Sequence, residues 1–323
     1  MSSNVKTTTD RQGMGTIRSA VFSLLRYREE FVEKTKEKKG GYVRQLIIGF
    51  EEPEIYLHPN AANNMRDEIY NLATSTNSKI ISTTHSPYMI DLSKSLDKQT
   101  YPKQILNLID LKPVKGEVTT STSHSKAFNI TDAYLKLKNE EKDYLKMILK
   151  MDDYISRVFF ASKIVIIEGD TEDIVLRETI KRMPQNVRKS VLSNYQIIKA
   201  RGKASIIALV KYLRSMGLDP IVIHDKDSKS GATKFNNPIL KACSSPSKRF
   251  MLKNNIEDVL GYAEPKDNKP FKAFEHIKKN WDLDLGWNGV DDNWRKICEK
   301  IFKDAFKPYL ISGIVQSVQA AKN

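Results

Sequence analysis

The chain has 323 residues, 40% of them hydrophobic, so it is long enough for two ordinary domains with apolar cores. Lys and Arg total 53 against 39 Asp and Glu, and the net charge of +14 favours a polyanionic partner, although lysines kept for solubility give the same surplus. Cys243 and Cys298 have no metal-ligand spacing and fit a reducing compartment. The polar N-terminus and the lack of a long apolar run predict a soluble, cytoplasmic protein with no membrane partner.

In the first half of the chain, short apolar runs alternate with helical patterns, which predicts a parallel sheet. A helix is expected over residues 16–38, ending at Gly40-Gly41, and another after Pro59. Residues 112–130 are rich in Thr, Ser and Lys without an apolar period, and we expect a loop or linker there. Strands are expected at residues 46–50, 79–83 and 105–109.

The second half begins with a helical segment over residues 131–158 and continues as a β-α-β-α-β pattern, which again predicts a parallel sheet. The helix at 172–183 is expected to be capped by Asp170 or Thr171. Residues 264–323 should be mostly helical, with the tryptophans Trp281, Trp287 and Trp294 as packing anchors. Strands are expected at 163–168, 195–199, 220–224 and 249–252, with a second helix at 205–216.

These patterns predict an α/β protein with two sheet-containing parts. The first part is assigned to residues 1–125 and the helical linker to residues 126–160. The second part, a Rossmann-like parallel sheet with a helical C-terminal extension, is assigned to residues 161–323.

One acidic motif follows the first predicted strand, where residues 46–50 run directly into Glu51 and Glu52. An apolar strand that ends in two acids is the Walker B arrangement, in which the first acid holds the Mg²⁺ shell and the second polarises the attacking water. A later strand leads into Thr84-His85-Ser86-Pro87, where His85 can contact a γ-phosphate. A buried strand with an acidic turn is the simpler alternative.

The order of Glu-Glu-Pro-Glu, Leu-His-Pro and Thr-His-Ser-Pro resembles the ATP-binding-cassette ATPases of the DNA-repair and SMC-like kind. Gly13 and Gly15 lie where that family has its signature motif, but without its Ser-Gly-Gly, and Glu51 stands in place of the usual Asp. The sequence contains no G-x-x-x-x-G-K-[ST]. The resemblance therefore implies that ATP binds only with a further N-terminal lobe, and that this chain is the C-terminal part of a longer protein or cannot hydrolyse ATP alone.

A second acidic group belongs to the later sheet. Glu168 closes one strand, Glu172 falls in the first turn of the next helix, and Asp225 and Asp227 alternate at the end of another strand, where residues i and i+2 point the same way. Four carboxylates at one sheet edge suit Mg²⁺ or Mn²⁺ rather than zinc. Two such ions, roughly 3.5–4 Å apart, can activate water and stabilise the leaving oxygen in phosphodiester cleavage. A single Asp-x-Asp is more often a solvated turn, and His224 is expected to pack in its strand.

The strand-end Glu-Gly followed by Asp-x-Asp resembles the Toprim domain. Glu168-Gly169-x-Thr171-Glu172 after an ATPase-like part resembles the overcoming-lysogenisation-defect (OLD) family of nucleases, which includes the nuclease of Gabija-type defence. The Gly202-Lys203 turn after the second strand also fits that family. The resemblance covers most of residues 10–262. It implies that Glu257 completes the second metal site and that Lys253 neutralises the scissile phosphate, with Lys226, Lys229 and Lys248 as open alternatives for that lysine.

The leading hypothesis is a divalent-metal-dependent DNA endonuclease or nickase of OLD type, gated or assembled by its ATPase-like half and acting in anti-phage defence. The resemblance also implies a homo-oligomer formed through the ATPase half, and a defence-system partner that is protein or nucleic acid. Two alternatives stay open. One is another Toprim chemistry, primase or topoisomerase, and the other is a non-catalytic DNA-binding ATPase accessory.

Overall fold

The computed structural model divides the chain into two compact units, residues 1–104 and 105–323, and each is considered by itself. For residues 110–113, 121–124 and 128 it describes the backbone only. The described residues are Gly13, Thr16, Ile17, Phe31 and residues 20–28, 46–74, 78–93, 104–113, 121–152, 154–228 and 230–309.

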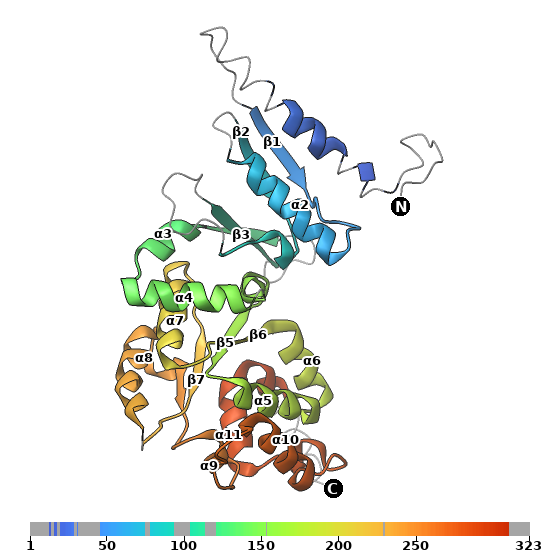
Figure 1. Cartoon of the computed structure of the whole chain (residues 1–323). Coiled ribbons are helices and arrows are strands. Elements are labelled where there is room, and N and C mark those ends of the chain that lie inside the picture. The colour runs from blue at the N-terminus through green and yellow to red at the C-terminus, as the bar shows by residue number, and fades with distance from the viewer. Residues whose placement is uncertain are drawn as a thin grey trace. The chain divides into compact units, whose positions relative to one another are not determined.

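The first unit contains the two predicted parallel strands, β1 (Leu46–Glu51) and β2 (Ser78–Thr83), paired from Leu46↔Ser78 to Glu51↔Thr83 (Figure 1). The predicted helix after Pro59 is α2 (Pro59–Leu72), which begins at a proline because an N1 residue needs no N–H donor. Its apolar face packs with Phe22 and the ring of Phe50 over β1. Within the predicted helix at 16–38, every residue that the structure describes is helical. Gly40-Gly41, where this helix was expected to end, lies outside the described residues.

The expectation of a loop at 112–130 is wrong where the structure describes it. β3 (Ile105–Pro113) and β4 (Ser121–Asn129) form an antiparallel ribbon, so the predicted strand at 105–109 exists but is not part of a parallel sheet. The apolar pattern failed here because none of the ribbon side chains that the structure describes is buried: Ile105 and Ile109 are exposed, as are residues 125–127. A strand without a buried face needs no alternation of apolar and polar residues, and its backbone ladder defines it instead.

The second unit is built on a four-stranded parallel sheet in the order β6-β5-β7-β8, and all four predicted strands are confirmed. Their near-continuous apolar runs are typical of parallel strands covered on both faces. The strands are β5 (Lys163–Ile167), β6 (Tyr195–Lys199), β7 (Ile221–His224) and β8 (Arg249–Met251).

Helices cover both faces of this sheet (Figure 1). The side chains of Val165, Ile167 and Ile223 enter a core shared with helices α5, α6, α10 and α11, and the predicted tryptophan anchors are buried in it. Helices α7 and α8 lie on the other face. The bounds are α5 (Asp170–Arg182), α6 (Gln185–Asn194), α7 (Lys203–Ser215), α8 (Asn236–Ala242), α9 (Ile256–Val259), α10 (Lys269–Asn280) and α11 (Asp292–Ile301).

The predicted helical segment at 131–158 is divided into α3 (Ile130–Leu135), α4 (Asn139–Met151) and a 3₁₀ turn, Ile155–Phe160. α4 contacts α7. Among the described helices, none is both long enough and apolar enough to cross a bilayer.

Candidate functional site

The carboxyl ends of β5 and β7 lie side by side, because the two strands are parallel neighbours in the sheet. Glu168 follows β5 and Asp225 follows β7. The backbone N–H of Asp225 donates to Glu168 Oε2 at 3.3 Å, so residues separated by more than fifty positions in the sequence meet at one edge. This edge is where ligands of open α/β sheets usually bind.

Glu172 reaches the same edge from the first turn of α5. The helix begins at Asp170, and its N-cap is Gly169 rather than the expected Asp170 or Thr171. The N–H of Gly169 donates to Glu172 Oε2 at 3.0 Å. This bond folds the buried Glu172 side chain back over the turn, toward the end of β5, and satisfies a free donor of the helix start.

Asp227 arrives by a turn and not by strand alternation, so the expected i, i+2 geometry is wrong. β7 ends at His224, and the N–H groups of Lys226 and Asp227 both donate to the carbonyl of Asn254, at 2.8 and 3.0 Å. Asp227 has a φ of 53°, in the left-handed region that a non-glycine residue seldom occupies. Such strained residues concentrate at functional sites, where surrounding contacts hold them.

Lys203 is the site residue that the sequence reasoning missed. Its side chain is 2% exposed, and its ammonium lies 2.8 Å from Asp227 Oδ2 and 3.0 Å from Asn236 Oδ1. It is the first residue of α7, directly after Gly202, whose φ of 121° only glycine adopts readily. The sequence feature that could have revealed Lys203 is the Gly202-Lys203 turn. The resemblance to the OLD family predicts it only as a turn and assigns its lysine no part in neutralising the carboxylates.

The lysines named as candidates lie elsewhere. Lys253 is exposed and lies before the start of α9, the helix that carries Glu257. Lys248 forms an ion pair with Asp219 at 3.0 Å, Lys226 is exposed, and Lys229 lies outside the described residues.

Glu257 is the fifth carboxylate of this region. It lies on α9, which is capped by Asn255 through a bond from the N–H of Asp258 to Asn255 Oδ1 at 2.9 Å. Its side chain is 1% exposed, and its charge acts on those of Glu172 and Asp225. We call Glu168, Glu172, Asp225, Asp227 and Glu257 the acidic edge.

Burial and mutual repulsion raise the proton affinity of the acidic edge. The pKa of Asp225 rises to about 9, first through burial and then through the charges of Glu172 and Glu168. Burial followed by the charge of Glu172 raises the pKa of Glu168 to about 7. The pKa values of Glu172 and Glu257 are also raised, mainly by burial. Carboxylates that disfavour one another's ionisation in this way are stabilised by a cation between them.

Two buried oxygens of the acidic edge accept no hydrogen bond from any described residue: Asp225 Oδ1 and Glu257 Oε1. An unsatisfied buried acceptor is costly, so it indicates a missing partner such as a water or an ion. Carboxylate oxygens are the ligands that Mg²⁺ and Mn²⁺ prefer, and the residues therefore fit a divalent ion. The fit is one of donor chemistry, because no three His, Cys, Asp or Glu side chains of the described residues lie close enough together to hold a metal ion.

His224 is fully buried in β7, as expected for strand packing. Its Nδ1 lies 2.8 Å from the carbonyl oxygen of Asp225, which can only accept, so Nδ1 carries the proton. Burial lowers the pKa of His224 to about 4. The ring is thus neutral and orients the backbone of Asp225.

In the first unit, the two predicted nucleotide-contacting residues Glu52 and His85 meet directly. Glu52 Oε1 is 3.2 Å from His85 Nε2, and the His85 side chain is 90% exposed. Glu51 ends β1, and Glu52 follows with a φ of 40°. The carbonyl oxygen of Gly13 accepts hydrogen bonds from the N–H groups of Thr16 and Ile17 at the start of a helical turn. Gly15 lies outside the described residues.

Comparison with protein families identifies two domains in the chain. Residues 1–90 match the AAA ATPase domain, and residues 159–227 match the overcoming lysogenization defect protein-like TOPRIM domain. The second match contains Lys203 and four residues of the acidic edge, and it ends before Glu257.

Three curated relatives are nucleases by name. The Old nuclease of Escherichia phage P2 is 27% identical over 67% of this chain and 33% of its own length. The OLD nuclease of Thermus scotoductus is 20% identical over 74% of this chain and 44% of its own length. The endonuclease GajA of Bacillus cereus is 24% identical over 81% of this chain and 38% of its own length. The chain thus spans less than half the length of these relatives.

The family matches and the relatives agree with the fold: an α/β unit with an acidic turn after its first strand, then a parallel sheet with acids at its carboxyl edge. The chain therefore combines an AAA ATPase domain with an OLD-like TOPRIM domain.

Proposed function

We propose that this chain carries the nuclease site of a divalent-metal-dependent DNA endonuclease or nickase of OLD type. The observation that supports this most is the acidic edge, where five carboxylates interact and two of their buried oxygens have no hydrogen-bond partner among the described residues. The relatives named as nucleases point to the same activity.

A charge count favours two metal ions. The five carboxylates carry five negative charges when ionised, and Lys203 contributes one positive charge in direct contact with them. Two divalent ions would balance the remaining four. Glu168, Glu172, Asp225, Asp227 and Glu257 would hold Mg²⁺ or Mn²⁺, which supply an activated water and stabilise the leaving oxygen in phosphodiester hydrolysis.

The chain's own residues would prepare this chemistry. The hydrogen bond from Asp225 N–H keeps Glu168 turned toward the neighbouring strand, and Lys203 holds Asp227. Glu168 would act either as a metal ligand or as the general base, and in the metal-free protein its pKa is about 7. Lys253 is exposed at the turn before α9 and would contact the phosphate of a bound strand.

We assign the nuclease domain to residues 161–323 and the ATPase part to residues 1–125. Residues 126–160, which contain the end of β4 and the helices α3 and α4, would link them. Nucleotide would act through the ATPase part, at Glu51, Glu52, His85 and the Gly13–Gly15 segment, to gate DNA access or assemble a homo-oligomer. Anti-phage defence is the biological role that the likeness to GajA supports.

Nicking of supercoiled plasmid tests the proposed function. Wild-type protein with Mg²⁺ or Mn²⁺ should convert the plasmid to open circles, and EDTA should stop the reaction. Glu168→Gln should abolish nicking while DNA binding is retained, because its amide is a poor ligand and no base. Metal-independent nicking, or full activity in Glu168→Gln, would refute the proposal.

A further inference from the structure

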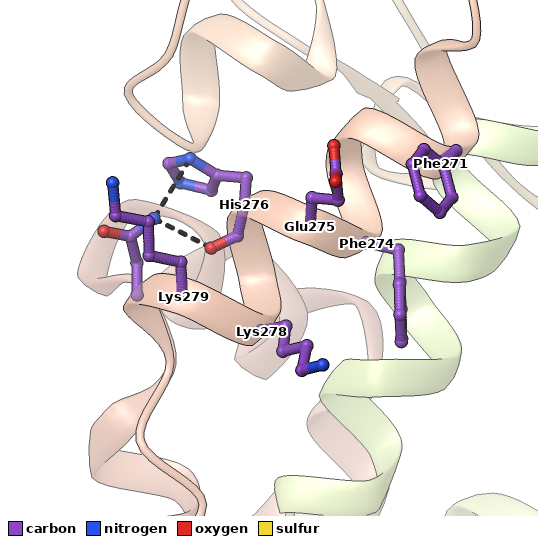
Figure 2. Close-up of a pocket in the computed structure, with 7 residues that line it drawn as sticks. Phe271, Phe274, Glu275, His276, Lys278 and Lys279 are labelled. Atoms are coloured by element: carbon purple, nitrogen blue, oxygen red, sulfur yellow. Dashed lines mark hydrogen bonds between the residues drawn. The ribbon is translucent and has the colours of Figure 1, made fainter.

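The outward face of α10 carries exposed aromatic side chains in a helix that is otherwise well anchored. Ala273 and Ile277 are buried in the core shared with α5. Phe271 and Phe274 are 58% and 37% exposed, and both lie on the same side of the helix (Figure 2). The three predicted tryptophan anchors are buried, whereas these two phenylalanines are exposed.

Lysines surround the exposed rings. Lys278 follows Phe271 by seven positions and Phe274 by four, which places it on the same stripe of the helix. The ammonium of Lys272 lies 5.8 Å from the centre of the Phe271 ring. The helix has four lysines and a single acid, Glu275, which pairs with Lys272. An open hollow beside α10 is lined by residues from more than one side of the helix: Phe271, Phe274, Glu275, His276, Lys278, Lys279 and Asn280 (Figure 2).

Two contacts connect α10 to the segment that carries Glu257. Lys269, the first residue of the helix, pairs with Glu264, which accepts from Asn255 Nδ2 at 2.9 Å. The pKa of Lys269 is raised by its hydrogen bond to Glu264 and by the charges of Glu257 and Asp225. The first residue of α10 therefore interacts electrostatically with two carboxylates of the acidic edge.

The second contact lies one helical turn before the end of α10. The His276 ring stacks on Tyr262 with centroids 4.4 Å apart, and the N–H of Tyr262 donates to the carbonyl of Glu257 at 3.1 Å. Both contacts hold α10 against the segment that carries Glu257. Lys269 and His276 are seven positions apart and share one side of the helix, whereas Phe271 and Phe274 lie on the opposite side from His276 (Figure 2).

We propose that this outer face of α10 binds single-stranded DNA. Exposed aromatic rings among lysines are the combination that binds unpaired nucleic acid, because bases stack on the rings while ammonium groups contact phosphates. A protein partner fits less well, since lysine is depleted from the centres of protein interfaces. The inference rests on the proposed function for its substrate, and it lies outside the part of the chain matched to the TOPRIM family.

Fluorescence anisotropy with a labelled single strand, in EDTA so that no cleavage occurs, tests the inference. Stacking is worth about 1–3 kcal/mol per base, so Phe271→Ala/Phe274→Ala should weaken binding of the single strand by roughly 5- to 150-fold for each ring on which a base stacks. Blunt duplex should lose much less. Lys278→Glu/Lys279→Glu should weaken both and reduce the salt dependence of binding.

Leu192→Ala is the matched control, because Leu192 is 67% exposed on α6 and its loss should leave binding unchanged. Unchanged single-strand affinity in the double Phe variant would overturn the inference. So would a change in oligomeric mass without a change in affinity, which would make the face a contact between copies.

Failure of the proposed function has a different outcome. If the wild type binds the single strand through Phe271 and Phe274 but never nicks plasmid, the nuclease function fails and the α10 inference stands. If the wild type nicks plasmid and the double Phe variant binds normally, only the α10 inference fails. If the wild type binds no single strand, the inference is overturned whatever the nicking assay gives.

Discussion

Replacing Lys203 by methionine should destabilise the metal-free TOPRIM unit strongly. The substitution keeps the length and apolar stem of the side chain but removes the ammonium that lies 2.8 Å from Asp227 Oδ2. At an effective dielectric constant of about 20, that pair attracts by about 6 kcal/mol before any desolvation is counted. Removing one partner of a buried pair typically costs about 3–5 kcal/mol, because the other charge is left uncompensated.

The expected loss can be followed by thermal unfolding in EDTA. A domain of this size loses about 2–4 °C for each kcal/mol, so the melting temperature should fall by roughly 6–20 °C. Mg²⁺ should restore more stability to Lys203→Met than to the wild type, because the ion replaces a missing cation next to Asp227.

Lys199→Met is the control, since it also removes a positive charge close to α5. Lys199 pairs with Asp170 at 2.9 Å and with Asp173 at 3.3 Å, and it is more exposed than Lys203. Its loss should cost about 1 kcal/mol or less. If Lys203→Met unfolds no earlier than Lys199→Met, then Lys203 does not neutralise the acidic edge and the reasoning is refuted.

The remaining predictions concern pH and the ATPase part. Because the folded pKa values of Asp225 and Glu168, about 9 and about 7, lie above their ordinary values, the unfolded chain releases these protons first as the pH rises. The contribution of these two groups to the stability of the metal-free protein should therefore be complete below about pH 4 and should be lost progressively up to about pH 9. The stability profile of Asp225→Asn should be flatter. A rise in melting temperature from pH 5 to pH 9 would contradict this reasoning. Glu52→Gln removes a carboxylate 3.2 Å from His85 and should leave metal-dependent nicking of permissive plasmid intact if nucleotide only gates access, whereas complete loss would show that the ATPase part takes part in cleavage.

The acidic edge was largely predictable because strand ends are visible in the sequence. Apolar runs located β5 and β7, parallel pairing brought their carboxyl ends together, and Glu168 and Asp225 follow directly. What the sequence could not give is the path of the chain after the strand. Asp227 reaches the site through a left-handed turn bonded to Asn254, a residue distant in sequence, and no period encodes that contact.

Lys203 and the strand β4 were missed for different reasons. A lysine at the start of a helix is normally exposed, but this one is buried where α7 packs on the sheet. None of the ribbon side chains that the structure describes is buried, so side-chain patterns carried no signal for β4, which its backbone ladder defines.

Calorimetric titration of Mn²⁺ into the DNA-free protein tests the central claim most directly, because the claim is that the acidic edge holds divalent ions. The wild type should bind two Mn²⁺ ions and release protons as it does so, since Asp225 and Glu168 must ionise. Asp225→Asn, which keeps the shape of the side chain, should lose at least one of these ions. Equal Mn²⁺ binding by the wild type and Asp225→Asn, or no binding by the wild type, would contradict the account.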